Sequence, residues 1–312
     1  LRRQRQMCIR DRVKLYNSDQ TSYYRSSEVE AVIHKALNYW FTAKPVCLNW
    51  WYNQIGIPKT LGTVFILFEK QLTPVEKQNA ITVMENAKFG MTGQNKVWLA
   101  GNVMMRALLQ NDYELVKMAR DTIASEIVTG GVEGIKDDWC FHQHGAQQQF
   151  GNYGLSFVSG MSFFSGLFSG TSLAFDDKQL SILSTLIDKG YRWVIWKGMM
   201  DVNALGRQLF HHAPVHKALR LAFAASELGG GESDECVAVA TALLRDNYPA
   251  PAVNVLTGHK HFWQSDYTIH RRPSWMASIK MASDRIIGTE MMNGDNMKGY
   301  YMACLLYTSP SP

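Results

Sequence analysis

Residues 97–108 read VWLAGNVMMRAL, and the apolar side chains in this stretch recur at intervals of three and four residues. The same spacing links Val32, Ala36 and Trp40. Apolar residues with this period line one face of an α-helix, which packs against other helices. We therefore expect a helical region over residues 27–250, built from helix pairs as in an α/α toroid or a helical bundle.

Capping residues and glycines predict where helices begin and end. Thr73, followed by Pro74 and then by Glu76, has the pattern of a capping box and predicts a helix start. Asn111 predicts a second start. Glycine-containing segments predict helix ends at 56–58, 90–93 and 229–231.

The pattern changes near Pro249 and Pro251. Residues 261–281 read HFWQSDYTIHRRPSWMASIKM, with aromatic and β-branched residues at roughly alternate positions. This pattern predicts two strands joined at Arg272-Pro273. Because only about fifty residues follow the proline pair, too few for a closed β-sandwich, we expect a shortened β-domain.

The predicted fold is therefore mostly α: an incomplete α/α toroid, without its N-terminal helices, followed by the first strands of a truncated antiparallel β-sandwich domain. We expect the toroid over residues 13–250 and the start of the β-sandwich over 251–303. Residues 1–12 and 304–312 do not continue the neighbouring patterns, and we expect them to be non-native flanks.

Composition limits the partners of the chain. Its 312 residues are 46% hydrophobic, which is enough to bury a large core. Five arginines and one aspartate among the first twelve residues supply +4 of the net charge of +5, so the remainder is nearly neutral. We expect no nucleic-acid partner. We also expect no membrane partner, since no stretch reaches the roughly 18 apolar residues of a membrane span.

The cysteines away from the two ends are Cys47, Cys140 and Cys236, and they lack CxxC spacing. This argues against a zinc site and against a disulfide scaffold. A thiol nucleophile at Cys140, with His142 or His144 as its base, is a weaker alternative. We expect neither a metal nor another cofactor.

Four loops carry more polar and aromatic side chains than turns require, which is typical of sites on a rigid scaffold. The most informative is residues 138–154, DWCFHQHGAQQQFGNYG, although a glycine-rich helix connection is the alternative explanation for any single loop. The other three are NWWYNQIG from Asn49, TGQNKVW from Thr92 and NALGRQLFHH from Asn203.

Together these segments resemble the polysaccharide lyases that cleave hyaluronan, chondroitin and xanthan, and in particular the chondroitin AC type. The resemblance covers most of residues 27–303 and includes KHFWQSDYTIHRRP and NGDNMKGYY. It implies an α/α toroid with β-sandwich domains, a secreted or periplasmic enzyme, and cleavage of an anionic polysaccharide by β-elimination. We further expect a monomer.

The resemblance implies five catalytic residues. Asn95 and His144 would mask the charge of a uronate carboxylate, so that the proton on the neighbouring C5 becomes acidic enough to remove. Tyr153 would take this proton and return it to the leaving glycosidic oxygen. Because a free phenol has a pKa of about 10, Arg207 would favour the phenolate. Glu290 would orient Arg207 or His144.

Each of these residues has a structural alternative. Tyr153 alone would be a packing ring, and His144 alone would be an ordinary loop residue. Arg207 would form a surface ion pair or lie at a helix C-terminus. Asn95 would be the N-cap of a helix that begins near Lys96.

Aromatic residues predict a platform on which sugar rings stack. Of Trp50 and Trp51, one ring should face the core and the other should face the glycan, and Trp139 would extend the platform. His211 lies four residues after Arg207, where the family commonly has a second arginine, so the exact substrate stays open. The predicted substrate-binding residues are Trp50, Trp51, Asn49, Asn53, Gln147, Trp98 and His211.

Two other functions remain open. A glycoside hydrolase on an α/α toroid needs paired carboxylates across a cleft, whereas Asp137 and Asp138 are sequence neighbours. A noncatalytic glycan-binding fragment would keep the tryptophan platform alone. The main prediction is a lyase that acts on chondroitin or hyaluronan.

Overall fold

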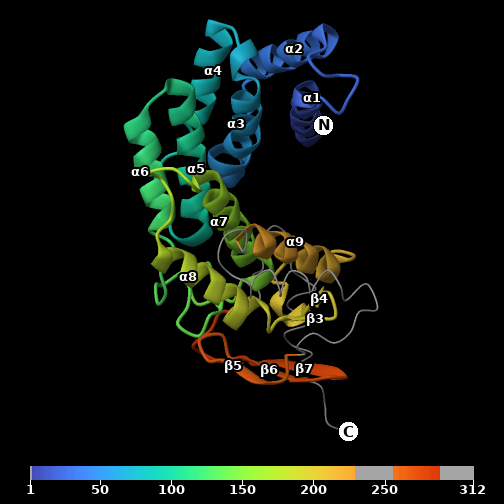
Figure 1. The fold of residues 1–312 in the computed structure, drawn as a ribbon, viewed down its shortest axis with the longest axis vertical. Coiled ribbons are helices and arrows are strands. Elements are labelled where there is room, and N and C mark those ends of the chain that lie inside the picture. The colour runs from blue at the N-terminus through green and yellow to red at the C-terminus, as the bar shows by residue number, and fades with distance from the viewer. Residues whose placement is uncertain (1, 229–255, 289–312) are drawn as a thin grey trace. The chain divides into compact units, whose positions relative to one another are not determined.

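The structure, a computed structural model, describes residues 2–228 and 256–288. Figure 1 labels its helices and strands. The chain divides into two compact units. The first unit comprises Leu1–Met91 and Asn95–Ile123, and the second comprises Thr92–Gln94 and Ala124–Pro312.

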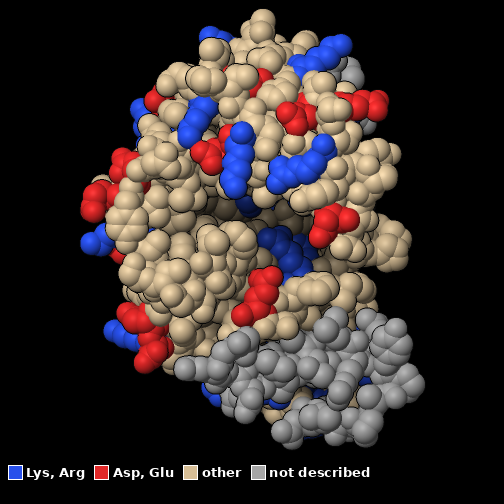
Figure 2. Space-filling model, turned by 45° about the horizontal axis from the view of Figure 1, so that its top comes forward, with Lys and Arg blue, Asp and Glu red and all other residues tan. Residues whose placement is uncertain are grey.

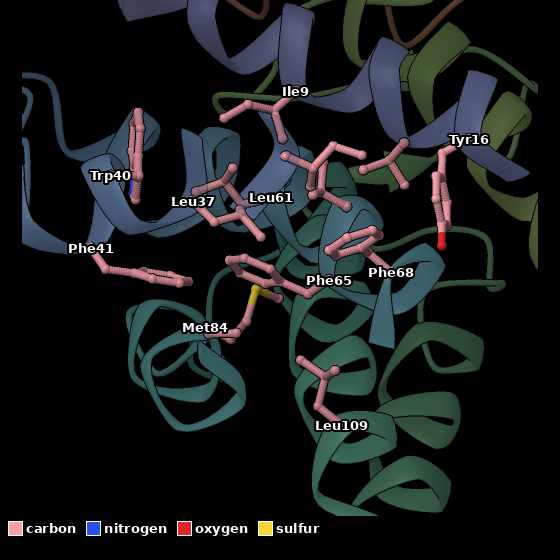
Figure 3. Packing of buried hydrophobic residues seen from close by; sticks show 14 residues of the cluster. Ile9, Tyr16, Leu37, Trp40, Phe41, Leu61, Phe65, Phe68, Met84 and Leu109 are labelled. Carbon is pink, nitrogen blue, oxygen red and sulfur yellow. The ribbon is translucent and has the colours of Figure 1, made fainter. Parts of the chain in front are cut away.

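The first unit is helical. Its aromatic core packs Phe65 of α3 against Phe41 of α2, with ring centroids 6.0 Å apart, and Phe68 of α3 against Tyr16 of α1 at 5.5 Å. Figure 3 shows these rings together with the aliphatic side chains around them. The helices are α1 (Arg2–Asn17), α2 (Ser27–Ala43), α3 (Ile57–Leu67), α4 (Pro74–Met84), α5 (Gly93–Gln110) and α6 (Tyr113–Ala124).

Helix α1 crosses the boundary that the sequence suggested at residue 12. Ile9, Val13 and Tyr16 follow the helical spacing and are buried in the core of the first unit. Ile9 comes from the segment that we expected to be a non-native flank, so this segment contributes an apolar side chain to the core.

The structure confirms one predicted helix boundary and corrects three others. The glycines at 90–93 do not end a helix, because α4 already ends at Met84 and α5 begins at Gly93. Thr73 and Glu76 form the capping box at the start of α4. Helix α6 is capped by Asp112 instead of Asn111, because Oδ1 of Asp112 accepts the backbone N–H of Leu115 at 3.0 Å. The predicted helix end at 56–58 is wrong: a π-helical turn, η1 (Tyr52–Gly56), leads directly into α3.

Gly56 has a right-handed helical conformation and does not end a helix. Its lack of a side chain is needed for packing, because a Cβ at this position would lie 2.8 Å from the Trp51 ring. Pro58, which has no backbone N–H to donate, lies where η1 passes into α3, and the wider π-helical turn before it accommodates the missing bond.

The second unit combines helices with short antiparallel strand pairs. Helices α7 and α9 pack on each other, and Oγ of Ser162 donates to the carbonyl of Ala224 at 2.8 Å. Its elements are β1 (Gly134–Ile135), β2 (Phe141–His142), the π-helical turn η3 (Phe150–Gly154), α7 (Leu155–Phe168), α8 (Asp177–Thr185), η4 (Leu186–Tyr191), β3 (Ile195–Trp196), β4 (Met199–Met200), the 3-10 turn η5 (Val202–Ala204) and α9 (Ala213–Leu228).

The second unit also contains a three-stranded antiparallel sheet of β5 (Gly258–Phe262), β6 (Tyr267–Arg272) and β7 (Trp275–Lys280), in that order. Arg272 pairs with Trp275, so the predicted turn at Arg272-Pro273 is confirmed. The sequence predicted two strands where there are three. The missed turn lies between Phe262 and Tyr267, where Asp266 adopts a left-handed conformation with φ of 47°.

The predicted order, with helices first and antiparallel strands after them, is confirmed. The predicted domain boundary near residue 250 and the glycines at 229–231 lie outside the described residues. Among the described helices, none is long and apolar enough to cross a membrane. On the face drawn in Figure 2, basic and acidic side chains lie interspersed, as the nearly neutral composition of the chain suggests.

Candidate active site

His144 lies on a tight loop that follows β2. His144 and Gly145 both have left-handed backbone conformations, with φ of 63° and 81°. This conformation costs a non-glycine residue about 1–2 kcal/mol, so the loop must be held by its surroundings. Glu133 provides one such contact, because its Oε1 accepts the backbone N–H of Gly145 at 3.0 Å.

Glu133 and Gln143 also hold the segment that precedes Asn95. Oε2 of Glu133 accepts hydrogen bonds from the hydroxyl of Thr92 and from the amide of Gln143. Oε1 of Gln143 in turn accepts the backbone N–H of Gln94 at 2.8 Å. The residues before Asn95 are therefore hydrogen-bonded to the loop that carries His144.

Tyr153 lies in the π-helical turn η3 and is 5% exposed. Its ring meets the ring of His144 edge to face, with centroids 4.8 Å apart and planes at 66°. Gly154 allows η3 to approach Phe141 of β2, because a Cβ at Gly154 would lie 2.9 Å from that side chain. The turn and the His144 loop are thus packed together.

Arg207 follows the 3-10 turn η5 and Gly206, which has a φ of 67°. Its guanidinium carbon lies 5.7 Å from the centre of the Tyr153 ring. At this distance a guanidinium over a ring face makes a cation–π contact. Gly151 lets η3 lie against the backbone before Arg207, because a Cβ there would be 2.7 Å from Cα of Leu205.

The second unit therefore brings together three of the predicted catalytic residues, His144, Tyr153 and Arg207. Asn95 belongs to the first unit. Glu290 lies outside the described residues.

Asn95 is 6% exposed and lies inside α5, which begins two residues earlier. It is therefore not the N-cap that the alternative interpretation required. Its Oδ1 atom is buried and has no hydrogen-bond partner among the described residues. A buried amide oxygen without a partner is costly, and such an atom in a native structure calls for an explanation.

The aromatic platform lies in the first unit. Trp51 meets Trp98 edge to face at 5.5 Å and Tyr52 at 5.3 Å, and Nζ of Lys59 lies 5.1 Å from the Trp98 ring centre. Trp50 is 44% exposed, whereas Trp51 is half-buried. The two neighbouring tryptophans thus differ in exposure, although neither ring is fully buried in the core. Trp139 belongs to the second unit.

The amides beside the platform make bonds within the protein. Asn53 accepts the backbone N–H of Cys47 at 2.9 Å and donates to the Cys47 carbonyl at 2.7 Å, so both ends of its side chain hold the backbone. Oδ1 of Asn49 accepts the backbone N–H of Trp51 at 3.0 Å. Both amides position the tryptophan segment.

Gln147 is also engaged within the protein. Its Nε2 donates to the carbonyl of Gly288 at 2.6 Å, and its Oε1 accepts from Gln149 at 2.9 Å. The backbone N–H of Ile287 donates to the carbonyl of Ala146 at 2.9 Å. The segment just before residue 289 therefore pairs with the His144 loop, a contact that the sequence did not indicate.

His211 is exposed and lies against His212, with ring centroids 3.7 Å apart.

A buried polar chain connects residues 138–142 to the turn between β5 and β6. Nε2 of His142 is 2.9 Å from Oγ of Ser265, which donates to Sγ of Cys140 at 3.0 Å. Burial raises the pKa of the Cys140 thiol well above its usual range. Cys140 is fully buried, and a buried thiol is a poor nucleophile, so this geometry argues against the thiol alternative.

Burial, and then the charge of Lys136, lowers the pKa of His142 to about 4, so its imidazole is neutral near pH 7. Asp138 is fully buried as well. Its carboxylate accepts the backbone N–H groups of Cys140 at 3.0 Å and Gln264 at 2.8 Å. These bonds give Asp138 a structural role. They do not fit a role for Asp138 as one of the paired catalytic carboxylates that a glycoside hydrolase needs.

Family models match both regions of the chain. The model described as polysaccharide lyase family 8, N terminal alpha-helical domain, matches residues 4–226. The model described as polysaccharide lyase family 8, super-sandwich domain, matches residues 257–306.

Among curated proteins, the chain is 28% identical over 299 residues to a chondroitinase-AC from Pedobacter heparinus, and the match covers 93% of this chain and 42% of that protein. It is 24% identical to a xanthan lyase from a Bacillus species, covering 90% of this chain and 34% of that protein. A hyaluronate lyase from Thermasporomyces composti is 28% identical, and the match covers 81% of this chain and 37% of that protein.

Among solved structures, a chondroitinase AC lyase studied with oligosaccharides matches with a TM-score of 0.84 and 26% identity, covering 96% of this chain and 45% of that one. A chondroitin AC lyase from Streptomyces coelicolor has the same fold, with a TM-score of 0.82 at 22% identity, covering 95% of this chain and 47% of that one. The chain thus spans less than half the length of these relatives. Because the first family model matches well over half of its residues, the chain belongs to polysaccharide lyase family 8.

Proposed function

We propose that this chain carries the catalytic residues of a lyase that cleaves 4-linked uronate glycans, chondroitin or hyaluronan, by β-elimination. Relatives named chondroitinase-AC and hyaluronate lyase support this substrate class. The observation that carries the proposal is that the His144 ring and the Arg207 guanidinium both lie against the ring of Tyr153. An imidazole, a phenol and a guanidinium suit proton abstraction beside a carboxylate.

The first step is charge masking. The C5 proton of a uronate is only weakly acidic while the C6 carboxylate carries a full negative charge. Asn95 and His144 would hydrogen-bond this carboxylate and stabilise the charge that develops on it as C5 loses its proton. The oxygens of the substrate carboxylate only accept hydrogen bonds, so the NH₂ group of Asn95 would be the end of the amide that meets them.

The second step is elimination. The Tyr153 phenolate takes the C5 proton, the C4–O bond breaks, and a C4=C5 double bond forms in the product. The same phenol then returns the proton to the departing glycosidic oxygen, so that atoms and charges balance over the cycle. Arg207 favours the phenolate because a fixed positive charge lies near its ring.

The aromatic group in the first unit would bind the glycan. Trp50 exposes a ring face that suits the C–H face of a pyranose, and Lys59 beside Trp98 supplies a cation for an anionic sugar. Asn49, Asn53 and Gln147 support the loops by bonds within the protein. Four points remain predictions from the sequence: the catalytic role of Glu290, the binding of substrate by His211, a monomeric state, and a secreted or periplasmic location.

The test is to incubate the chain with chondroitin and, separately, with hyaluronan, and to record ultraviolet absorbance and new reducing ends together. A lyase produces both in equal amounts, because each cleavage creates one conjugated unsaturated uronate. Reducing ends without absorbance would indicate a hydrolase. Neither signal, with the glycan still bound in a calorimetric titration, would indicate a noncatalytic binding fragment. Either of these results contradicts the proposal.

A further inference from the structure

Helix α9 buries a lysine whose charge has no role in the reaction described above. Lys217 is 4% exposed. Its ammonium donates to the backbone carbonyl of Gly151 and, at 2.7 Å, to Oε1 of Gln208. Both partners are uncharged, so the two bonds only partly offset the cost of removing an ammonium from water. Burial, and then the charge of Arg220, lowers the pKa of Lys217 to about 8.

The two partners of Lys217 come from the two elements that carry Tyr153 and Arg207. Gly151 lies in η3, two residues before Tyr153. Gln208 directly follows Arg207. The same two elements are already in close backbone contact where Gly151 meets Leu205. Lys217 therefore joins them from a third element, α9, by two hydrogen bonds of one ammonium group.

We propose that Lys217 is a positioning residue that holds η3 and the Arg207 loop together, so that the guanidinium of Arg207 stays over the ring of Tyr153. The proposal rests on the lyase function proposed above. An apolar side chain at this position would fill the same space without the cost of a buried charge, so core packing does not explain a lysine here. Unlike an apolar side chain, the lysine donates one hydrogen bond to η3 and one to the Arg207 loop.

A double-mutant cycle with Arg207 tests this role. Lys217→Met keeps an unbranched side chain that is one atom shorter than lysine, and it removes both bonds. A misplacement of about 1 Å in a catalytic group costs up to about 100-fold in rate, so we expect kcat to fall about 10- to 100-fold. KM should change less than about threefold. The kcat–pH profile should shift to higher pH. In the Arg207→Met background, the same substitution should lower kcat by less than about threefold.

An equal loss of kcat in both backgrounds would show that Lys217 does not act through Arg207 and would overturn the proposal. A rise in KM alone would also overturn it. Lys189→Met is the matched control: this lysine is in the same unit, its side chain is 60% exposed, and it pairs with Asp188 at 3.1 Å. The control should keep the wild-type kcat and pH profile.

Gln208→Leu covers the case in which Lys217→Met fails to fold. The side chain of Gln208 is exposed, and its loss removes one bond of Lys217 without changing any charge. It should lower kcat in the same direction by a smaller factor, with a thermal midpoint within about 4 °C of wild type. Wild-type kcat in both folded variants would contradict the proposal.

A readout that does not need turnover separates this proposal from the proposed function. In the chain labelled with ¹³C-tyrosine, the Tyr153 resonance is the one that Tyr153→Phe removes. Its titration midpoint should move to higher pH in Gln208→Leu, which leaves the charge of Lys217 in place. A shift without any unsaturated product would defeat the lyase proposal and leave the role of Lys217 standing. Product formation with neither a kcat change nor a shift would defeat the role of Lys217 alone.

Discussion

The guanidinium carbon of Arg207 lies 5.7 Å from the centre of the Tyr153 ring, and these two residues are 54 positions apart in the chain. In the proposed mechanism this positive charge is what favours the phenolate over the phenol. We predict that Arg207→Met lowers kcat at neutral pH by about 100-fold or more and moves the rising limb of the kcat–pH profile upward by about 1 pH unit or more.

The measurement is kcat against pH at saturating glycan for the wild-type chain, Arg207→Met and Arg192→Met. Arg192 is the control because its guanidinium pairs with Asp188 at 2.9 Å. A loss of rate in Arg207→Met with an unmoved pH profile would mean that the arginine binds substrate and does not act on Tyr153.

A second prediction concerns the contact between Gly93 and Gln143. Gly93 has a φ of 57°, and a Cβ there would lie 2.4 Å from Oε1 of Gln143. Gly93→Ala should therefore push Gln143 away from the N–H of Gln94 and release the His144 loop. We expect kcat to fall about 10- to 100-fold, measured by product absorbance at saturating glycan.

Gly170→Ala is the control for backbone strain. Gly170 has a φ of 72°, and a Cβ there would meet nothing within 4 Å, so the substitution adds strain without a collision. Gly170→Ala should lose about 1–2 kcal/mol of stability in urea unfolding, Gly93→Ala should lose at least as much, and only Gly93→Ala should lose activity. Equal activity in the two variants would show that the Gln143 contact does not support the site.

A third prediction concerns the pH dependence of stability. The pKa of His142 is about 4 in the folded chain and about 6.5 when unfolded, so between these values the unfolded chain holds more protons. His142 therefore makes the free energy of unfolding rise with pH from 4 to 6.5, and acid in this window destabilises the fold.

The check is urea unfolding at several pH values between 4 and 7 for the wild-type chain and His142→Gln. The free energy of unfolding of His142→Gln should change less with pH across this window than that of the wild-type chain. His261→Gln is the control, since His261 is exposed on β5. Parallel curves for wild type and His142→Gln would rule out a neutral buried imidazole.

A fourth prediction concerns the core of the first unit. Phe65 is fully buried and stacks on Phe41 at 6.0 Å. Phe65→Ala should cost about 3–5 kcal/mol of unfolding free energy, because it removes buried apolar surface and leaves a cavity. Met118→Ala, at an exposed position of α6, should change stability by about 0.5 kcal/mol or less. Urea unfolding followed by circular dichroism measures the free energy of unfolding of both variants. Equal losses of stability in the two would contradict the packing of this core.

Local sequence signals predicted local structure where the determining residues are neighbours in the chain. The capping box at Thr73 and the turn at Arg272-Pro273 depend on neighbouring residues only, and both are confirmed. Gly56 was misread as a helix end because its actual requirement is space for the Trp51 ring. The turn before β6 was missed because it lacks glycine and depends on Asp266 in a left-handed conformation.

The candidate site was predicted in part. The family resemblance pointed to His144, Tyr153 and Arg207, which the second unit brings together. It gave no sign of Glu133 or Lys217, because their roles arise from contacts with distant backbone atoms, which no local pattern encodes. For the same reason, Asn53 and Gln147 were assigned to substrate although their amides hold the protein backbone.

The central claim is that the phenol of Tyr153 removes the C5 proton, and Tyr153→Phe tests it most directly. The variant keeps the ring that packs on His144 and removes only the hydroxyl. We predict that the absorbance of unsaturated product falls by about 100- to 10,000-fold, while the glycan dissociation constant measured by calorimetry changes less than about threefold. Turnover of Tyr153→Phe at the wild-type rate would contradict the account.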